Sequence, residues 1–85
     1  MKATLAIMAR DLISWRESKT AVLAILMHVL GVSQLEISES DLGCTLEMNP
    51  TKAVKSMETI LNYFRKNYEG TPLSVSLLVR HGQEQ

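Results

Sequence analysis

The chain has 85 residues, which is enough for one small domain with a thin margin of core burial. Nine basic and nine acidic side chains leave no net charge, so the composition is not that of a strongly basic nucleic-acid-binding domain. A single cysteine cannot form an internal disulfide, and it favours a reducing compartment, the cytoplasm. Apolar residues make up 46% of the chain, and this rich supply favours stabilisation as a homodimer.

The first segment predicts an N-terminal helix, which we assign to residues 1–17. Over residues 3–16 its apolar side chains recur at steps of three and four, as on one face of a helix. No glycine or proline separates it from the next segment, so one continuous helix over residues 3–30 is an alternative. Four polar residues at 16–19 favour a break. The apolar face supplies the candidate dimer interface, formed by Leu5, Met8, Leu12 and Trp15.

The second segment, residues 20–32, is the most apolar part of the chain. Between Ala21 and Leu30 only His28 is not apolar. Because a helix that is apolar all round is normally buried, we expect a buried helix over residues 19–30, with Gly31 as its left-handed C-cap. The apolar run is shorter than the roughly 20 residues that a membrane-spanning helix needs, so no membrane span is predicted.

The remaining segments predict a short helix, a longer helix and a strand. Residues 33–37 form a short extended piece, and residues 38–48 form a short helix. Gly43 within it indicates either close approach of another backbone or the end of the helix. Asn49 and Pro50 are typical of an N-cap and a first helical turn, so a helix begins at Pro50 and covers residues 50–67. Residues 72–80 alternate between apolar and polar, as in a strand with one buried side. Residues 81–85 are a polar, frayed tail.

Two groups of residues in this order carry a resemblance to a known superfamily. Leu42, Gly43, Leu46 and Met48 look like the first helix and turn of a helix-turn-helix, and Val54, Met57 and Leu61 look like the inward positions of its second helix. Residues 20–80 thus resemble the winged helix-turn-helix superfamily. The resemblance implies a mainly α fold with a small β component. One domain over residues 1–85 would have four helices and a C-terminal strand, with residues 18–80 as its winged-helix-like core.

The resemblance also implies a function, that of a small DNA-binding transcriptional regulator or a regulatory accessory protein. In that superfamily the second helix enters the major groove, so the helix over residues 50–67 would contact duplex DNA. The residues implied at the DNA are Thr51, Lys52, Lys55, Ser56 and Thr59 on the helix, with Arg80 and His81 at the tip of the wing.

A homodimeric protein-interaction module without nucleic-acid binding is the alternative function. The N-terminal helix and the buried helix would form its dimer seam, and the acidic segment over residues 36–47 would face another protein. The sequence does not predict an enzyme, a metal site or a cofactor. His28, Cys44 and His81 lack metal-ligand spacing, and no glycine-rich phosphate loop is present. We expect His28 to be a hydrogen-bonded core residue and Cys44 to be a small apolar filler.

Overall fold

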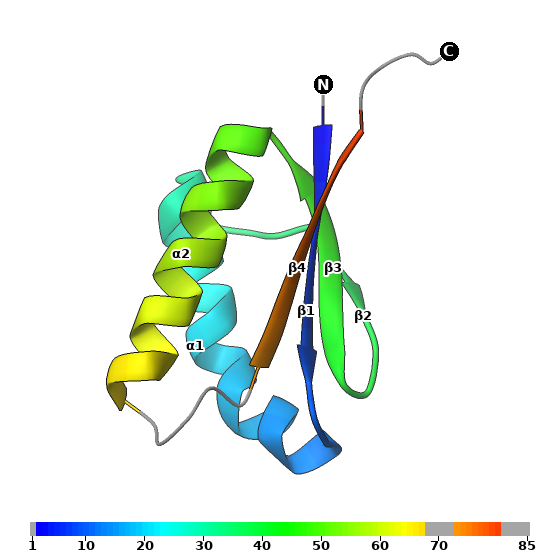
Figure 1. The fold of residues 1–85 in the computed structure, drawn as a ribbon, viewed down its shortest axis with the longest axis vertical. Coiled ribbons are helices and arrows are strands. Elements are labelled where there is room, and N and C mark those ends of the chain that lie inside the picture. Colours follow the sequence, from blue (N-terminus) through cyan, green and yellow to red (C-terminus); the bar gives the residue numbers. More distant parts are fainter. Residues whose placement is uncertain (1, 68–72, 81–85) are drawn as a thin grey trace.

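The computed structural model describes residues 2–67 and 73–80, with the backbone alone described for Arg80. In chain order the elements are β1 (Lys2–Ala9), α1 (Leu12–Leu30), β2 (Ser38–Glu39), β3 (Gly43–Met48), α2 (Pro50–Asn67) and β4 (Leu73–Arg80). The strands form one antiparallel sheet in the order β2-β3-β1-β4, and both helices cover the same face of it (Figure 1). This βαββαβ order and sheet topology are the ferredoxin-like arrangement.

The prediction of a mainly α, winged-helix-like fold with four helices is therefore wrong, because the described chain has two helices and a four-stranded sheet. The N-terminal helix assigned to residues 1–17 is instead β1 followed by the start of α1. The short helix expected over residues 38–48 is the β2–β3 hairpin. In β1 the residues that face the helices alternate strictly with residues that do not, which is the period of a strand. The four buried residues are Ala3, Leu5, Ile7 and Ala9.

Helix α1 begins earlier than expected and runs without a break through residues 16–19. Asp11 is its N-cap, because the Asp11 Oδ1 atom accepts a hydrogen bond of 2.7 Å from the backbone N–H of Ser14. The prediction that Gly31 is a left-handed C-cap is confirmed by its φ of 68°. Neither the break at residues 16–19 nor a helix over residues 3–30 is correct.

Helix α1 also exposes one side, so the expectation of burial all round is wrong. Its buried stripe faces the sheet and consists of Ser14, Trp15, Ser18, Val22, Leu26 and Val29. On the opposite side Thr20, Ala24 and His28 are exposed. His28 is therefore not a core residue. The other apolar residues over residues 21–30, apart from Ala24, are half-buried on either side of the stripe. Exposure of Ala24 costs little free energy, because isolated apolar residues are common at protein surfaces.

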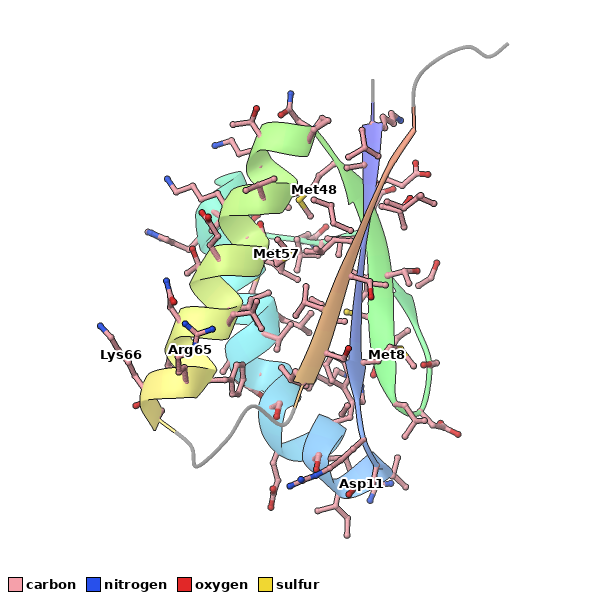
Figure 2. All side chains as sticks on the ribbon, in the orientation of Figure 1. Met8, Asp11, Met48, Met57, Arg65 and Lys66 are labelled. Carbon is pink, nitrogen blue, oxygen red and sulfur yellow. The ribbon has the colours of Figure 1, made fainter. Side chains whose placement is uncertain are left out.

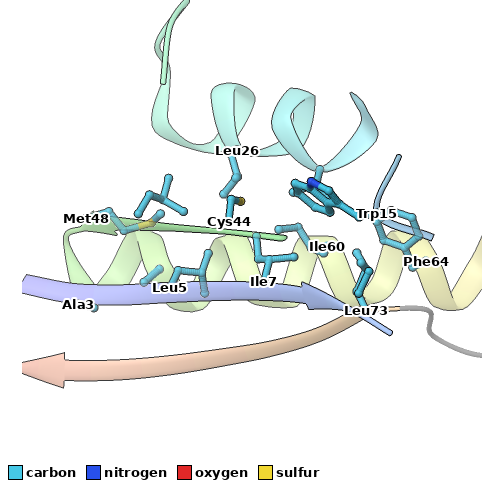
Figure 3. Close-up of a cluster of buried hydrophobic side chains, with 14 residues drawn as sticks. Ala3, Leu5, Ile7, Trp15, Leu26, Cys44, Met48, Ile60, Phe64 and Leu73 are labelled. Atoms are coloured by element: carbon cyan, nitrogen blue, oxygen red, sulfur yellow. The ribbon is translucent and has the colours of Figure 1, made fainter. Parts of the chain in front are cut away.

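Helix α2 and strand β4 agree with the sequence predictions. The helix begins at Pro50, and the backbone N–H of Thr51 donates a hydrogen bond of 2.8 Å to the side-chain oxygen of Asn49. The core lies between the sheet and the two helices (Figure 3). There α1 contributes Trp15 and Leu26, and α2 contributes Ile60 and Phe64.

Candidate functional site

The face of the sheet opposite the helices is not covered by any described element. Strand alternation directs Thr4, Ala6 and Met8 of β1 to this open face, and the register brings the following residues beside them: Thr45, Glu47, Ser74, Ser76 and Leu78. One class of RNA-binding domain uses a four-stranded sheet to bind single-stranded RNA by stacking bases on aromatic side chains. The described part of the open face carries no aromatic residue. It therefore offers no stacking platform for nucleic acid.

A groove of about 880 Å³ lies where the segment before β2 joins the sheet. It forms because β2 pairs with β3 only at Thr45 and Cys44, which leaves the rest of β3 uncovered on that side. The groove is open to solvent, and its lining is mixed in charge. It consists of Lys2, Thr4, Leu35, Glu36, Ile37, Ser38, Thr45, Leu46 and Glu47. In the part of the chain that the structure describes, no three histidine, cysteine or carboxylate side chains come together as a metal site would require.

The cluster around Glu39 connects β2 to α1. The Glu39 Oε2 atom lies 2.7 Å from Lys19 Nζ and accepts a hydrogen bond of 3.3 Å from Trp15 Nε1. The bond from Lys19, followed by the bond from Trp15, lowers the pKa of the Glu39 carboxyl below its ordinary value. Burial raises the pKa of the nearby Cys44 thiol to about 11, so this cysteine is not an activated nucleophile. These contacts hold the hairpin on the helix and supply no reactive group.

The residues predicted to contact DNA do not form one surface. Ser56 is fully buried and its hydroxyl lies 3.7 Å from the sulfur of Met48, so it cannot contact DNA. Lys52 is exposed, but its Nζ atom donates a hydrogen bond of 3.2 Å to the carbonyl oxygen of Val29 and so caps the C-terminal end of α1. Thr51 and Lys55 are exposed.

Three further residues were predicted to contact DNA, namely Thr59, Arg80 and His81. The hydroxyl of Thr59 donates a 2.7 Å bond to the carbonyl oxygen of Lys55 within α2. Arg80 is paired with Lys2 in the sheet, and His81 lies outside the described residues. Since α2 lies flat on the sheet and follows a strand, the described chain contains no helix-turn-helix. The exposed side of α2 does carry four basic residues against one carboxylate, and Lys66 extends away from the sheet (Figure 2).

The four residues predicted as a dimer interface are divided between the core and the surface. Leu5 is fully buried and Trp15 almost fully buried, so both are used inside one chain. Met8 and Leu12 are 40% and 41% exposed at the end of the sheet where β1 leads into α1. An interface that uses all four would require the core to open.

Strand β4 is an edge strand with a free side. Within the described residues it pairs only with β1, through a continuous register from Leu73 to Arg80. Residues 73–79 contain no proline and no charge, whereas edge strands usually carry such features to prevent pairing with other chains. Leu78 is 59% exposed on the open face, and Val79 is 36% exposed on the helix side. The outer edge of β4 is thus an unprotected template for another strand.

One flank of α2 continues this apolar edge. Lys52 on the other flank binds the end of α1, so the stripe formed by Val54, Met57 and Leu61 faces away from α1 and toward β4. Figure 2 shows Met57 on the side of α2 nearest the sheet. Val54 is exposed, and the other two are half-buried. We call this flank, together with Val75, Leu77, Leu78 and Val79 of β4, the β4 edge surface.

We compared the chain with protein-family models, curated proteins and solved structures, and none of them matches it. A functional assignment therefore depends on the geometry of the chain itself. Of the two helices in the described residues, neither has the length and apolarity needed to cross a membrane. The sequence predicted β4 as a strand but not the β4 edge surface, because only the strand order shows which strand lies at the edge.

Proposed function

We propose that this protein is a non-catalytic interaction module that binds another polypeptide strand along the free edge of β4. The observation that carries the proposal is an edge strand of eight residues without proline, and without charge over residues 73–79. An added strand would pair with the outward N–H and C=O groups of β4, and the side chains of the β4 edge surface would pack against it. This is the chemistry of recognition by strand addition.

Binding of duplex DNA through α2 stays a prediction. The contacts of its implied residues support it less than the free edge of β4 supports strand binding. Two of its implied contact residues have structural tasks, because Ser56 is buried and Lys52 caps α1. The basic side of α2 is equally consistent with an ordinary solvated helix face. A homodimeric interaction module, which is the alternative function from the sequence, agrees better with a free edge. Location in the cytoplasm stays a prediction supported by the single cysteine.

Strand binding is tested with a short fluorescent peptide. Valine and threonine alternate along this peptide, and a lysine stands at each end. The matched control is the same peptide with an N-methyl group on every residue, which removes the backbone donors on both edges. We expect saturable binding by fluorescence anisotropy for the first peptide and none for the second. Val79→Lys should weaken binding by about tenfold or more, since a charge at the edge opposes strand pairing. Thr20→Lys, on the exposed side of α1, should leave binding unchanged.

Amide hydrogen exchange gives a second measure, which does not depend on the peptide. If another chain already occupies β4, the outward amides of β4 will be protected and the peptide will have to compete for the site. The proposal is overturned if the peptide does not bind and the outward β4 amides exchange freely at high protein concentration.

A further inference from the structure

We infer that the strand bound by β4 is the β4 strand of a second copy of this chain, paired antiparallel in a register centred on Ser76. The inference rests on the proposed function and names its partner. It is drawn from the side-chain pattern of β4, from the position of α2 above it and from the character of the other edge of the sheet.

The side-chain pattern of β4 is self-complementary in this register. Odd-numbered residues of β4 face the helices and even-numbered residues face the open side, so opposite residues must share parity if both copies keep their helices on one face. A centre at Ser76 places Leu73 opposite the partner's Val79 and Val75 opposite the partner's Leu77. All four apolar positions on the helix side are then paired, and residues 73–79 contain no charge to oppose another.

Neighbouring registers satisfy these conditions less well. A shift by one residue places the helices of the two copies on opposite faces of the joined sheet. A centre at Leu77 leaves Leu73 without a partner and places Arg80 opposite the partner's Ser74. The register centred on Ser76 uses the whole uncharged part of the strand and leaves Arg80 outside it.

The position of α2 allows the helices of the two copies to pack together. Helix α2 lies over both β1 and β4 (Figure 1). A two-fold axis between the two β4 strands relates the copies. Strands in a sheet are about 4.8 Å apart, and α2 lies over both β1 and β4, so each α2 axis lies about 4.8 Å from the two-fold axis. The two α2 axes are therefore about 10 Å apart. Packed helices are typically 8–10 Å apart. The flanks that meet there carry Val54, Met57 and Leu61, which would cover each other above the paired strands.

The opposite edge of the sheet does not favour further growth. Strand β2 has two residues, Ser38 and Glu39, and the acidic side chains of Glu36 and Asp41 lie next to it in the sequence. The short stretch of β3 that β2 leaves unpaired contains the charged residue Glu47. Short, charged edges resist pairing with another chain. A two-fold interface uses the β4 edge of both copies, so the assembly closes as a dimer.

Cysteine cross-linking tests the register directly. In a Cys44→Ala background, Ser76→Cys places two thiols opposite each other across the two-fold axis. Opposite residues in antiparallel pairs have Cα atoms about 4.5–5.5 Å apart, within the range that a disulfide spans. We expect nearly complete disulfide-linked dimer under mild oxidation at low protein concentration. Light scattering of the wild-type chain should give twice the monomer mass. Light scattering of the Val79→Lys variant should give the monomer mass.

The matched control is Ser74→Cys in the same background. This residue lies opposite the partner's Leu78, and the two copies of it are about 13 Å apart along the strands, so it should not link to itself. A mixture of the Ser74→Cys and Leu78→Cys proteins should form mixed disulfides. The inference is overturned if the wild type is a monomer, or if Ser76→Cys links no faster than Ser74→Cys. Peptide binding by such a monomer would leave the proposed function standing, and its absence would remove both.

Discussion

Gly43 of β3 lies so close to Ile7 of β1 that a β-carbon at position 43 would overlap the carbonyl oxygen of Ile7. The backbone N–H of Ala9 donates a 2.7 Å hydrogen bond to the carbonyl oxygen of Leu42, which fixes the end of β1 against the β2–β3 hairpin. Close approach of another backbone at Gly43 was one of two interpretations of the sequence, although within a helix; the other was the end of that helix. In the structure the glycine allows two strands to meet at the end of the sheet.

Gly43→Ala should lower the free energy of unfolding by about 1–3 kcal/mol, because the added methyl group forces β1 and β3 apart. Urea denaturation followed by circular dichroism measures the change. Gly31 provides the contrast, since it has a left-handed φ but no neighbouring atom within 4 Å of a β-carbon. Asparagine tolerates that backbone conformation, so Gly31→Asn should be tolerated and Gly43→Asn should not. Wild-type stability of Gly43→Ala would contradict the close approach.

Leu5→Ala should lower the free energy of unfolding by about 2–5 kcal/mol, because Leu5 is fully buried between the sheet and the helices. Ile13→Ala removes an apolar side chain that is 67% exposed, and its effect should stay within about 0.5 kcal/mol. Thermal and urea denaturation of both variants measure the difference. An equal effect of the two substitutions would argue against the position of β1 in the core.

The stability of the protein should fall in acid through Glu39 and Asp11. Hydrogen bonds from Lys19 and Trp15 lower the pKa of Glu39 from 4.5, and the backbone N–H of Ser14 lowers the pKa of Asp11 from 3.8. A lowered pKa in the folded state means that the unfolded state binds protons more tightly. The stabilisation is therefore complete above the ordinary pKa values and is lost as the pH falls through the lowered ones.

Thermal unfolding measured over a pH series checks this dependence. The Glu39→Gln and Asp11→Asn variants should each show a weaker decrease of the midpoint temperature below about pH 4.5 than the wild type does. A Glu39→Gln profile parallel to that of the wild type would show that the contacts of Glu39 with Lys19 and Trp15 do not contribute to folding.

The Cys44 thiol should react slowly with thiol reagents in the native protein. Its side chain is 1% exposed and its pKa is raised to about 11 by burial, so little thiolate is present or accessible near neutral pH. Ellman's reagent should react slowly with the native chain and rapidly after addition of urea. A rapid reaction without denaturant would place Cys44 at the surface instead of beneath α1.

The sequence by itself determined the elements that depend on local chemistry. Asn49 and Pro50 began α2 at the predicted residue, Gly31 ended α1, and the alternation after Pro72 predicted β4. Caps, prolines and regular periods act over a few residues, so they can be recognised without knowing the fold.

Only the tertiary structure decided which surfaces are free. In β1, Ala6 and Met8 are apolar although they do not face the helices, so the same residues fitted a helical period as well as a strand period. The position of β4 at the edge, and therefore the β4 edge surface, follows from pairing between segments that are far apart in the chain. The hydrogen bond from Lys52 to the carbonyl oxygen of Val29 also depends on long-range packing, because only the packing of the two helices brings these residues together. Local patterns specify segments, and long-range pairing specifies their neighbours.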